Sequence, residues 1–304
     1  MKASLSVLSA LMCLSAGGVL ASGPALAADP AAPHPDARTF SVGKLELVAV
    51  HDAQFMPPND GKVFGADVGA EAVATVLKSA GAATDKIVLS VDGLVVKTEQ
   101  HLVLIDTGLG AKSGGVMLQS LALASIKPEA ITDVLITHAH GDHIGGLLGA
   151  DGNLAFPNAT IRMSAAEWTW LQSQAGMADL VKVISGKVAT FEPGKLVAPG
   201  ITSVEIKGHT PGHVGYEIAS GKAHLLDIGD TAHSSIISLT KPDWVMGYDS
   251  DAVVGKESRR FLLTKLAKSH ETIFAPHFPF PGVGQIVAKG DHFAWKPSLK
   301  PGDE

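Results

Sequence analysis

The chain has 304 residues, of which 46% are hydrophobic and 18% are charged, and its formal net charge is −6. This length and apolar content are sufficient to bury a sizeable core, in one large domain or in two fused halves. An acidic balance without an obvious basic face argues against a nucleic-acid-binding protein that depends on neutralising phosphates.

The first residues have the pattern of a secretory signal peptide. Lys2 precedes a mostly apolar run at 5–20, and the small residues Ala25 and Ala27 form a cleavage signature. The run is short and diluted by Ser and Gly, which argues against a stable membrane anchor. We therefore expect residues 1–27 to be removed and the mature protein to be periplasmic or secreted.

The single cysteine, Cys13, lies inside this predicted signal peptide. The mature protein would therefore contain no disulfide, and a metal site in it could not use a thiolate ligand. Residues 28–39 are rich in Ala, Pro and Asp and are expected to be a linker. Residues 40–304 are then expected to form one catalytic domain.

The first half of that domain mixes short strand patterns with helical ones. Strands are indicated by alternating or continuous apolar residues, and helices by apolar residues at helical spacing. In chain order we predict a strand at 44–51, a helix at 67–79, a hairpin from 93–98 and 101–105, a helix at 117–126 that ends before Pro128, and a short buried strand at 133–136.

The second half repeats this mixture. Ser164 and Glu167 have the spacing of a capping box, which predicts a helix running through Trp170. The further predicted elements are strands at 201–206, 214–219 and 223–228, a helix at 251–268 with Val254, Phe261, Leu262 and Leu266 as core residues, and a strand at 272–275. Two successive halves of this kind predict an α/β fold in which two sheets stack face to face with helices outside, an αββα sandwich.

The strongest chemical signal directly follows the predicted strand at 133–136. Three histidines and one aspartate occur there within six positions, with Gly141 giving the backbone freedom to turn: His138, His140, Asp142 and His143. The first two side chains can point at one metal ion and the last two at a second. Imidazole and carboxylate ligands suit zinc and related divalent ions.

This cluster resembles the HxHxDH signature of the metallo-β-lactamase superfamily. Other segments support the resemblance in chain order, from about residue 40 to the end: Asp106-Thr107-Gly108, Gly208 to His213, Gly229-Asp230 and Ala275-Pro276-His277. Within that superfamily, the segments 156–159 and 277–284 are most similar to the methyl parathion hydrolase and lactonase-like group.

The resemblance implies a complete set of ligands for two divalent ions, with zinc expected and Mn, Fe or Co as alternatives. It assigns His138, His140 and His209 to one ion, Asp142, His143 and His277 to the other, and Asp230 as a bridge between both. It also implies that Asp106 orients a ligand histidine, although a strand-end aspartate can equally cap a turn. His213 is expected to shape its turn rather than to bind metal.

Water shared by two divalent ions loses a proton near neutral pH and can attack a C=O or P=O group. We expect Asp142, Asp230 and His233 to take part in catalysis. His233 could donate to a carbonyl or protonate an alkoxide leaving group. Alternatively, it is a histidine on a loop that only meets water.

The substrate implied by the resemblance is a small neutral ester. Lactones, including acyl homoserine lactones, are the first choice, organophosphate triesters the second, and a β-lactam the third. An iron persulfide dioxygenase, a nuclease of the same fold and a metal-binding protein without catalysis are the rival hypotheses. The resemblance is also compatible with a homodimer.

Four aromatic residues near the motifs are candidate substrate contacts: Phe278, Phe280, Trp168 and Trp170. Phe55, Met56 and Phe64 lie in a loop that often overhangs the metals in such folds. Aromatic residues at any of these positions are as often part of an ordinary core.

Overall fold

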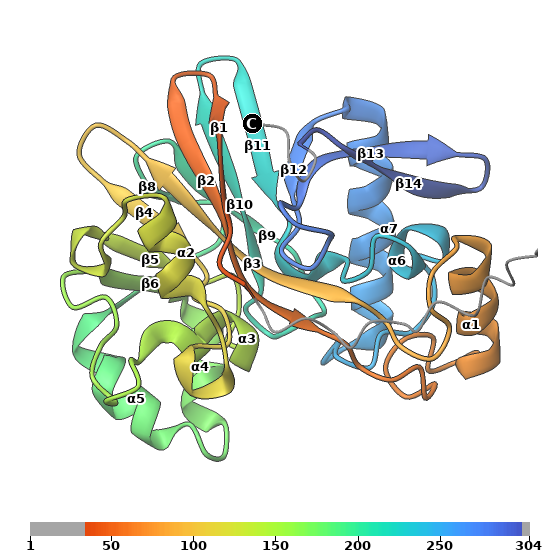
Figure 1. The fold of residues 1–304 in the computed structure, drawn as a ribbon, viewed down its shortest axis with the longest axis horizontal. Helices are drawn as coiled ribbons and strands as arrows, with labels where there is room; N and C mark the ends of the chain where they lie inside the picture. The colour runs from red at the N-terminus through yellow and green to blue at the C-terminus, as the bar shows by residue number, and fades with distance from the viewer. Residues whose placement is uncertain (1–33, 300–304) are drawn as a thin grey trace, which may run out of the picture. The chain divides into compact units, whose positions relative to one another are not determined.

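The computed structural model describes residues 34–299 (Figure 1). The predicted signal peptide at 1–27 and residues 28–33 of the predicted linker lie outside the described residues. The last residues of that linker, 37–39, are instead part of a strand, β1 (Ala37–Val42). No helix in the described part is both long and apolar enough to cross a membrane.

Two seven-stranded mixed sheets form the centre of the structure. The first has the order β1-β2-β3-β4-β5-β6-β7, and its strands from β4 to β7 are parallel. Its members are β1 (Ala37–Val42), β2 (Leu45–Phe55), β3 (Leu89–Lys97), β4 (Leu102–Ile105), β5 (Asp133–Leu135), β6 (Thr160–Ser164) and β7 (Val188–Phe191).

The second sheet has the order β14-β13-β12-β11-β10-β9-β8 and contains one parallel pair, β11 with β12. Its members are β8 (Leu196–Ala198), β9 (Ile201–Glu205), β10 (Val214–Ser220), β11 (Ala223–Asp227), β12 (Thr272–Phe274), β13 (Val283–Lys289) and β14 (His292–Pro297). Tyr216 of β10 links the sheets, since its hydroxyl donates to the carbonyl oxygen of Ile136 at 2.7 Å.

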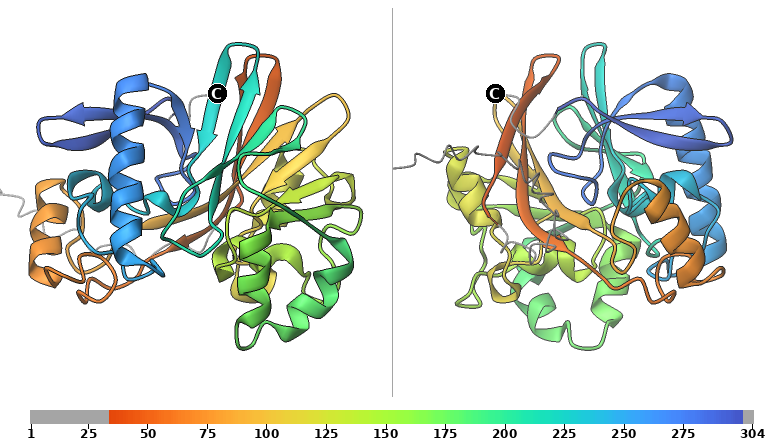
Figure 2. Two further views of the ribbon diagram at one scale, coloured as in Figure 1. Left: turned by 180° about the vertical axis from the view of Figure 1, so that it is seen from behind. Right: turned by 45° about the vertical axis from the view of Figure 1, so that its right-hand side comes forward.

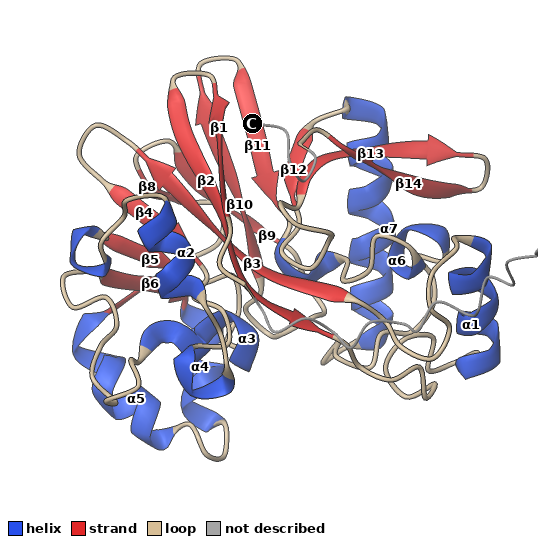
Figure 3. Ribbon diagram, in the orientation of Figure 1, coloured by secondary structure: helices blue, strands red, loops and turns tan. Residues whose placement is uncertain are grey.

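Helices lie outside both sheets, as the ribbon coloured by secondary structure shows (Figure 3). They are α1 (Ala70–Ser79), α2 (Met117–Leu123), α3 (Gly141–Ile144), α4 (Ala165–Ser173), α5 (Ala178–Ile184), α6 (Ile237–Thr240) and α7 (Ala252–Ser269). Short 3₁₀ turns occupy Ala111–Ser113, Pro128–Ala130, Gly145–Leu147, Ser185–Lys187 and Gly229–Thr231. In the further views, blue α7 stays with the second sheet and green α4 and α5 with the first (Figure 2).

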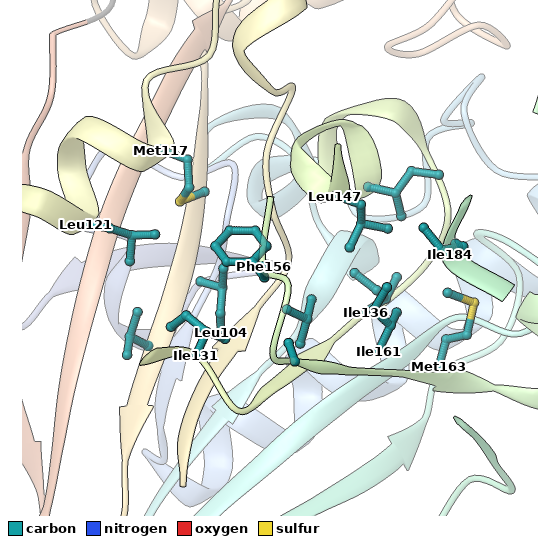
Figure 4. Packing of buried hydrophobic residues seen from close by; sticks show 14 of the residues in the cluster. Leu104, Met117, Leu121, Ile131, Ile136, Leu147, Phe156, Ile161, Met163 and Ile184 are labelled. Atoms are coloured by element: carbon teal, nitrogen blue, oxygen red, sulfur yellow. The ribbon is translucent and has the colours of Figure 1, made fainter. Parts of the chain in front are cut away.

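The central strand β4 is apolar on both faces because its sheet is covered on both sides. In β4, Leu104 packs against the outer helices, in the cluster that includes Leu121 of α2 and Leu171 of α4 (Figure 4). Its neighbours Val103 and Ile105 point the other way, into the cluster shared by the two sheets. Because successive side chains of β4 point to opposite faces, this one short strand contributes to both the outer core under the helices and the core between the sheets.

The predicted αββα sandwich is confirmed. The predicted strands and helices correspond to β2 to β5, β9 to β12, α1, α2, α4 and α7, with ends that differ by a few residues. The hairpin of β13 and β14 was not predicted, because these strands are only half-buried and carry polar residues that break the apolar pattern.

Two predicted core residues of helix α7 lie outside the buried core, since Val254 is only partly buried and the prediction for Phe261 is wrong. Phe261 is 73% exposed, whereas Leu262 and Leu266 are buried against the second sheet. The buried face of α7 also carries Arg259, which is only 2% exposed. Because a charged residue lies on the buried face of this helix, the spacing of its apolar residues alone does not predict which face is buried.

Candidate metal centre

The predicted metal ligands lie at the ends of strands from both sheets. His138, His140, Asp142 and His143 follow β5 and enter α3, while Asp230 follows β11 and His277 follows β12. His209 comes from the turn between β9 and β10. The carboxyl ends of neighbouring parallel strands meet at one edge of a sheet, so these loops converge although they are far apart in sequence.

Three histidines form the first group. The Nε2 atoms of His138 and His209 are 3.1 Å apart, and Nδ1 of His140 lies 3.1 Å and 3.0 Å from them. Together with a carboxylate oxygen of Asp230, these nitrogens all lie within 4.8 Å of one another. The group has the size and the donor atoms of a site for one divalent ion.

Asp142, His143 and His277 form the second group, also within 4.8 Å. Asp230 stands between the two groups. Its Oδ2 lies 3.5 Å from His138 Nε2 and 3.3 Å from His209 Nε2, while its Oδ1 lies 3.3 Å from His143 Nε2 and 3.1 Å from His277 Nε2. One carboxylate therefore presents one oxygen to each group.

Two buried atoms of this arrangement lack a hydrogen-bond partner among the described residues, Nε2 of His143 and Oδ1 of Asp230. Buried polar atoms are rarely left unpaired, and a cation between them would satisfy both. The donor set is five imidazoles and two carboxylates, which fits two ions of the zinc, manganese, iron or cobalt type. The residues present therefore fit a dinuclear metal centre.

The electrostatics of the site favour a bound cation or proton beside the Asp230 carboxylate. Burial by itself would raise the pKa of Asp230, but the surrounding histidines hold it well below its usual range. Burial would lower the pKa of His277, yet the Asp230 carboxylate outweighs it and raises this pKa to about 9. Without metal the carboxylate is thus balanced by a proton on His277, which a divalent ion would displace.

Several of the ligand histidines are oriented by a second contact. Asp106 accepts from Nδ1 of His143 at 2.8 Å and also from the backbone N–H of Thr137. The sequence left open whether Asp106 orients a ligand or caps a turn; it orients His143 and also binds the loop that follows β5. The carbonyl of Ser90 accepts from Nδ1 of His277 at 2.7 Å. Such contacts fix the ring orientation and the tautomer.

Asp249 has the same relation to His209, although no motif or periodicity indicated it. Its Oδ1 accepts from Nδ1 of His209 at 3.0 Å, and its Oδ2 lies 3.4 Å from the guanidinium of Arg259. Arg259 also donates to the carbonyl of Pro242 at 3.0 Å. A buried arginine on α7 thus holds the carboxylate that orients a ligand.

His213 shapes its turn, as predicted, and contacts the bridging residue as well. Its Nδ1 donates to the carbonyl of Ile206 at 3.0 Å, and its Nε2 accepts from the backbone N–H of Asp230 at the same distance. Burial lowers the pKa of His213 to about 3, so the ring is neutral and can act as donor and acceptor at once.

Glu167 joins two of the ligand loops. Ser164 accepts from the backbone N–H of Glu167, as in the predicted capping box, but the Glu167 carboxylate does not return to the start of α4. It accepts from the N–H of Ala139 at 2.7 Å, the hydroxyl of Thr210 at 2.8 Å and the N–H of Gly212 at 2.9 Å. The capping-box pattern predicted the position of Glu167 at the start of the helix, but it did not predict the contacts of its carboxylate with the two ligand loops.

A cavity of about 400 Å³ opens onto both metal groups. Apolar side chains form much of its wall, and the metal ligands form its base, the lining being Phe55, Leu89, Val91, Leu109, Ser113, His140, Gly141, Asp142, Asp230, His233, Tyr248 and His277. A cavity of this size and character fits a small, largely apolar molecule. Phe55 is part of it, although it is the last residue of β2 and does not lie in a loop as predicted.

His233 faces this cavity and is 2% exposed. Its Nε2 lies 3.1 Å from Oδ2 of Asp230, and its ring stacks on His277 with centroids 5.6 Å apart. Burial lowers the pKa of His233 despite the nearby carboxylate. The alternative of a histidine that only meets water is therefore wrong, while a catalytic role stays a prediction.

Tyr248 is a cavity residue that the sequence did not indicate. Its ring lies 5.9 Å from that of His233, and burial raises the pKa of its hydroxyl, which keeps it protonated. It lies in the loop between α6 and α7, where no motif or periodicity marked it.

The predicted aromatic contacts lie elsewhere. Phe278 is fully buried and packs on Trp295 at 5.0 Å, so it is a core residue and not a cavity wall. Phe280 lines a different cavity. Trp168 and Trp170 pack against the core outside the first sheet, and the Trp170 ring lies 5.7 Å from His140. Phe278 and Phe280 follow the ligand His277 in sequence, but their side chains do not point into the metal-centre cavity. The chain turns directly after His277.

Comparison with known proteins agrees with this geometry. The family described as the metallo-beta-lactamase superfamily matches residues 88–277. The chain is 30% identical to hydroxyacylglutathione hydrolase of Yersinia pestis (strain Pestoides F) over 142 residues, 47% of either protein. It is 35% identical to exodeoxyribonuclease WalJ of Streptococcus pneumoniae serotype 2 over 113 residues, 37% of this chain and 39% of that one. The alignment with the first of these spans about half of that protein's length.

Two solved structures align over nearly their whole length. AidC, a dizinc quorum-quenching lactonase in complex with a homoserine product, has a TM-score of 0.83 and 28% identity, covering 88% of this chain and 99% of its own. The hydrolase AbOPH, described as in the beta-lactamase superfamily, has a TM-score of 0.80 and 26% identity, covering 88% and 98%. An N-acyl homoserine lactone lactonase at 19% identity and a TM-score of 0.57 shares the fold.

Proposed function

The chain belongs to the metallo-β-lactamase superfamily as a metal-dependent hydrolase, and from this premise we propose that it is a lactonase acting on acyl homoserine lactones. The observation that carries the proposal is the mainly apolar cavity of about 400 Å³ that ends on two metal-binding groups. The similarity to AidC over 99% of that chain supports the same substrate class.

Two divalent ions in these groups would supply Lewis acidity and lower the pKa of water. The chain's own residues hold and orient the reactants. His138, His140 and His209 would hold one ion, Asp142, His143 and His277 the other, and Asp230 both.

We propose that Asp142 handles the proton that the reaction moves. Its side chain is 29% exposed and lines the cavity, whereas that of Asp230 is 3% exposed. A carboxylate at the cavity can accept a proton and pass it to the alkoxide that leaves when a lactone ring opens. A phenolate leaving group needs this help less, because it is a weaker base.

His233 and Tyr248 lie together on the cavity wall. With its pKa lowered, His233 is neutral near pH 7 and has one N–H to donate, and the protonated Tyr248 has one O–H. We propose that these donors bind the lactone carbonyl and stabilise the negative charge that develops on it.

The proposal is tested by measuring kcat/KM of the metal-loaded protein for two substrates, a long-chain acyl homoserine lactone and an aryl dialkyl phosphotriester. We expect a lactone value above about 10⁴ M⁻¹s⁻¹ and a smaller triester value. The reverse order would replace the lactonase by the second candidate, an organophosphate hydrolase, which the similarity to AbOPH supports.

The role of His233 can be separated from that of the metal centre. We expect His233→Leu to lower kcat/KM for the lactone about 10²-fold and to affect the triester less, because a donor that also protonates the leaving group matters for an alkoxide and little for a phenolate. His224→Leu is the matched control, since His224 is an exposed histidine on β11. Equal losses on both substrates would contradict the assignment.

We further propose that the protein is exported and that residues 1–27 are removed, on the strength of the apolar run and the cleavage signature. Fractionation of expressing bacteria and N-terminal sequencing of the purified protein test this. A start near Ala28 in the periplasmic or secreted fraction supports it, and an intact Met1 in the cytoplasmic fraction contradicts it.

A further inference from the structure

A second cavity, of about 430 Å³, lies next to the metal centre. The first residues of β3 separate the two, because successive side chains of a strand point to opposite faces. Leu89 and Val91 line the metal-centre cavity, whereas Val88 and Ser90 line the second one. The mechanism described above makes no use of this second cavity.

Most of its wall is apolar. The apolar side chains come from α1, the following loop, the residues before α6 and the segment after the last ligand, and include Leu77, Ile87, Ile236, Pro279 and Phe280. Val88 is 51% exposed there, which is unusual for a valine beside a strand. These surfaces fit a hydrocarbon chain.

His51 gives the cavity a polar end. Its Nδ1 lies 2.7 Å from Oδ1 of Asp92, and the edge of the ring contacts Phe280 with centroids 5.4 Å apart. Asp92 is 3% exposed, so its carboxylate is committed to this imidazole. Nε2 of His51 has no hydrogen-bond partner within residues 34–299 and is the ring atom left for a ligand.

The ionisable side chains that line the cavity are His34, Asp36, His51 and Lys86. Burial by itself would lower the pKa of His51, but the hydrogen bond and the charge of Asp92 outweigh it and raise this pKa, which favours the imidazolium. Lys86 also lines the cavity, and the carboxylate of Asp36 is paired with Arg38 at 2.7 Å. An anionic head group is therefore better suited to this cavity than a cationic one.

We propose that the second cavity binds an apolar monocarboxylate, with its chain against Ile87 and Phe280 and its carboxylate on Nε2 of His51. Pockets of this size commonly hold one small molecule. A charge-assisted hydrogen bond from a ring fixed by Asp92 gives the head group a defined position. The site is distinct from the metal centre, although Ser90 contributes its side chain to this cavity and its carbonyl to His277.

The test is calorimetric titration of the metal-loaded protein with decanoate, in two variants that each fill one cavity. Ala83 lines the second cavity and Ser113 the metal-centre cavity, and both are exposed, so a tryptophan at either position can be accommodated. We expect Ala83→Trp to weaken a decanoate-binding event at least about tenfold and Ser113→Trp to leave that event within about twofold.

Two further titrations test the head group. His51→Gln keeps a hydrogen-bond donor for Asp92 but removes the charge, and we expect it to weaken the same event about tenfold. Decyltrimethylammonium, with the same chain and the opposite charge, should bind at least about tenfold more weakly than decanoate. The proposal would be overturned if decanoate did not bind, or if its binding were lost only in Ser113→Trp. Equal binding of decanoate and decyltrimethylammonium would overturn it as well.

Discussion

At the scale of single residues, Asp230 is the side chain on which both metal groups depend. Its Oδ2 lies near His138 and His209 of the first group, and its Oδ1 lies near His143 and His277 of the second. We expect Asp230→Ala to lose both ions, because each group loses the carboxylate that it shares with the other group. Elemental analysis of the purified variant measures this.

Asp291→Ala is the control for that variant, since the Asp291 side chain is 94% exposed on the turn between β13 and β14. It should keep the metal content of the unmodified protein. A full complement of both ions in Asp230→Ala would show that Asp230 is not a bridge.

Glu167 gives a second prediction at this scale. Its carboxylate accepts three hydrogen bonds that join the loop of His138 and His140 to the loop of His209. Glu167→Gln replaces one acceptor oxygen by an NH₂ group that faces a donor, at a cost of about 1–3 kcal/mol. We expect the ion of that group to be bound more weakly than the other, so that chelator titration removes it first.

The exposed Glu257 of α7 provides the comparison, because Glu257→Gln changes the same group on the surface. It should leave the chelator titration unchanged. Simultaneous loss of both ions from Glu167→Gln would mean that Glu167 stabilises the fold in general rather than one ligand group.

At the scale of elements, helix α7 fixes the loop that precedes it. Arg259 donates to Pro242 and lies near Asp249, and Tyr248 of the same loop lines the cavity. Arg259→Met leaves the buried Asp249 without its cation, for which a cost of about 3–5 kcal/mol is typical. We expect a lower Tm and a higher KM, since the loop that carries Tyr248 loses its anchor.

The neighbouring Arg260 makes a matched control on the same helix. It pairs with Asp243 at 2.7 Å, but both side chains are more than half exposed. Arg260→Met should change stability by no more than about 1 kcal/mol. If both variants behave alike in thermal denaturation and in KM, the loop does not depend on the buried arginine.

At the scale of the whole molecule, the buried Asp227 makes stability depend on pH. Burial raises its pKa from 3.8 to about 8, with a smaller contribution from Asp106. At a pH between 3.8 and about 8, the Asp227 carboxyl is protonated in the folded protein and ionised in the unfolded chain. The free energy of unfolding of the metal-free protein therefore falls as pH rises, by up to about 1.4 kcal/mol per pH unit from this group.

Asp227→Asn removes that titration while keeping an acceptor for the N–H of Gly229, which lies 2.9 Å from Asp227 Oδ1. We expect urea denaturation of the metal-free variant to show a flatter decline of stability between pH 4 and about 8. Asp85→Asn, at an exposed position, should keep the original slope. An unchanged slope in Asp227→Asn would show that the carboxyl is ionised when folded.

The sequence by itself determined the fold class and pointed to the residues that converge on the metal centre. Strand periodicity and short motifs are local, and His138, His140, Asp142 and His143 lie within one such motif. His209, Asp230 and His277 were assigned by resemblance, since no local pattern links them to that motif. The structure brings all seven together.

Only the tertiary structure decided what surrounds that centre. Tyr248 and Asp249 reach it because α7 anchors their loop, and Glu167 reaches it because α4 packs beside two ligand loops. Phe278 and Phe280 follow a ligand directly, yet one lies in the core and the other in a second cavity. The direction of a side chain in a loop is set by long-range packing and hydrogen bonds, which have no period in the sequence.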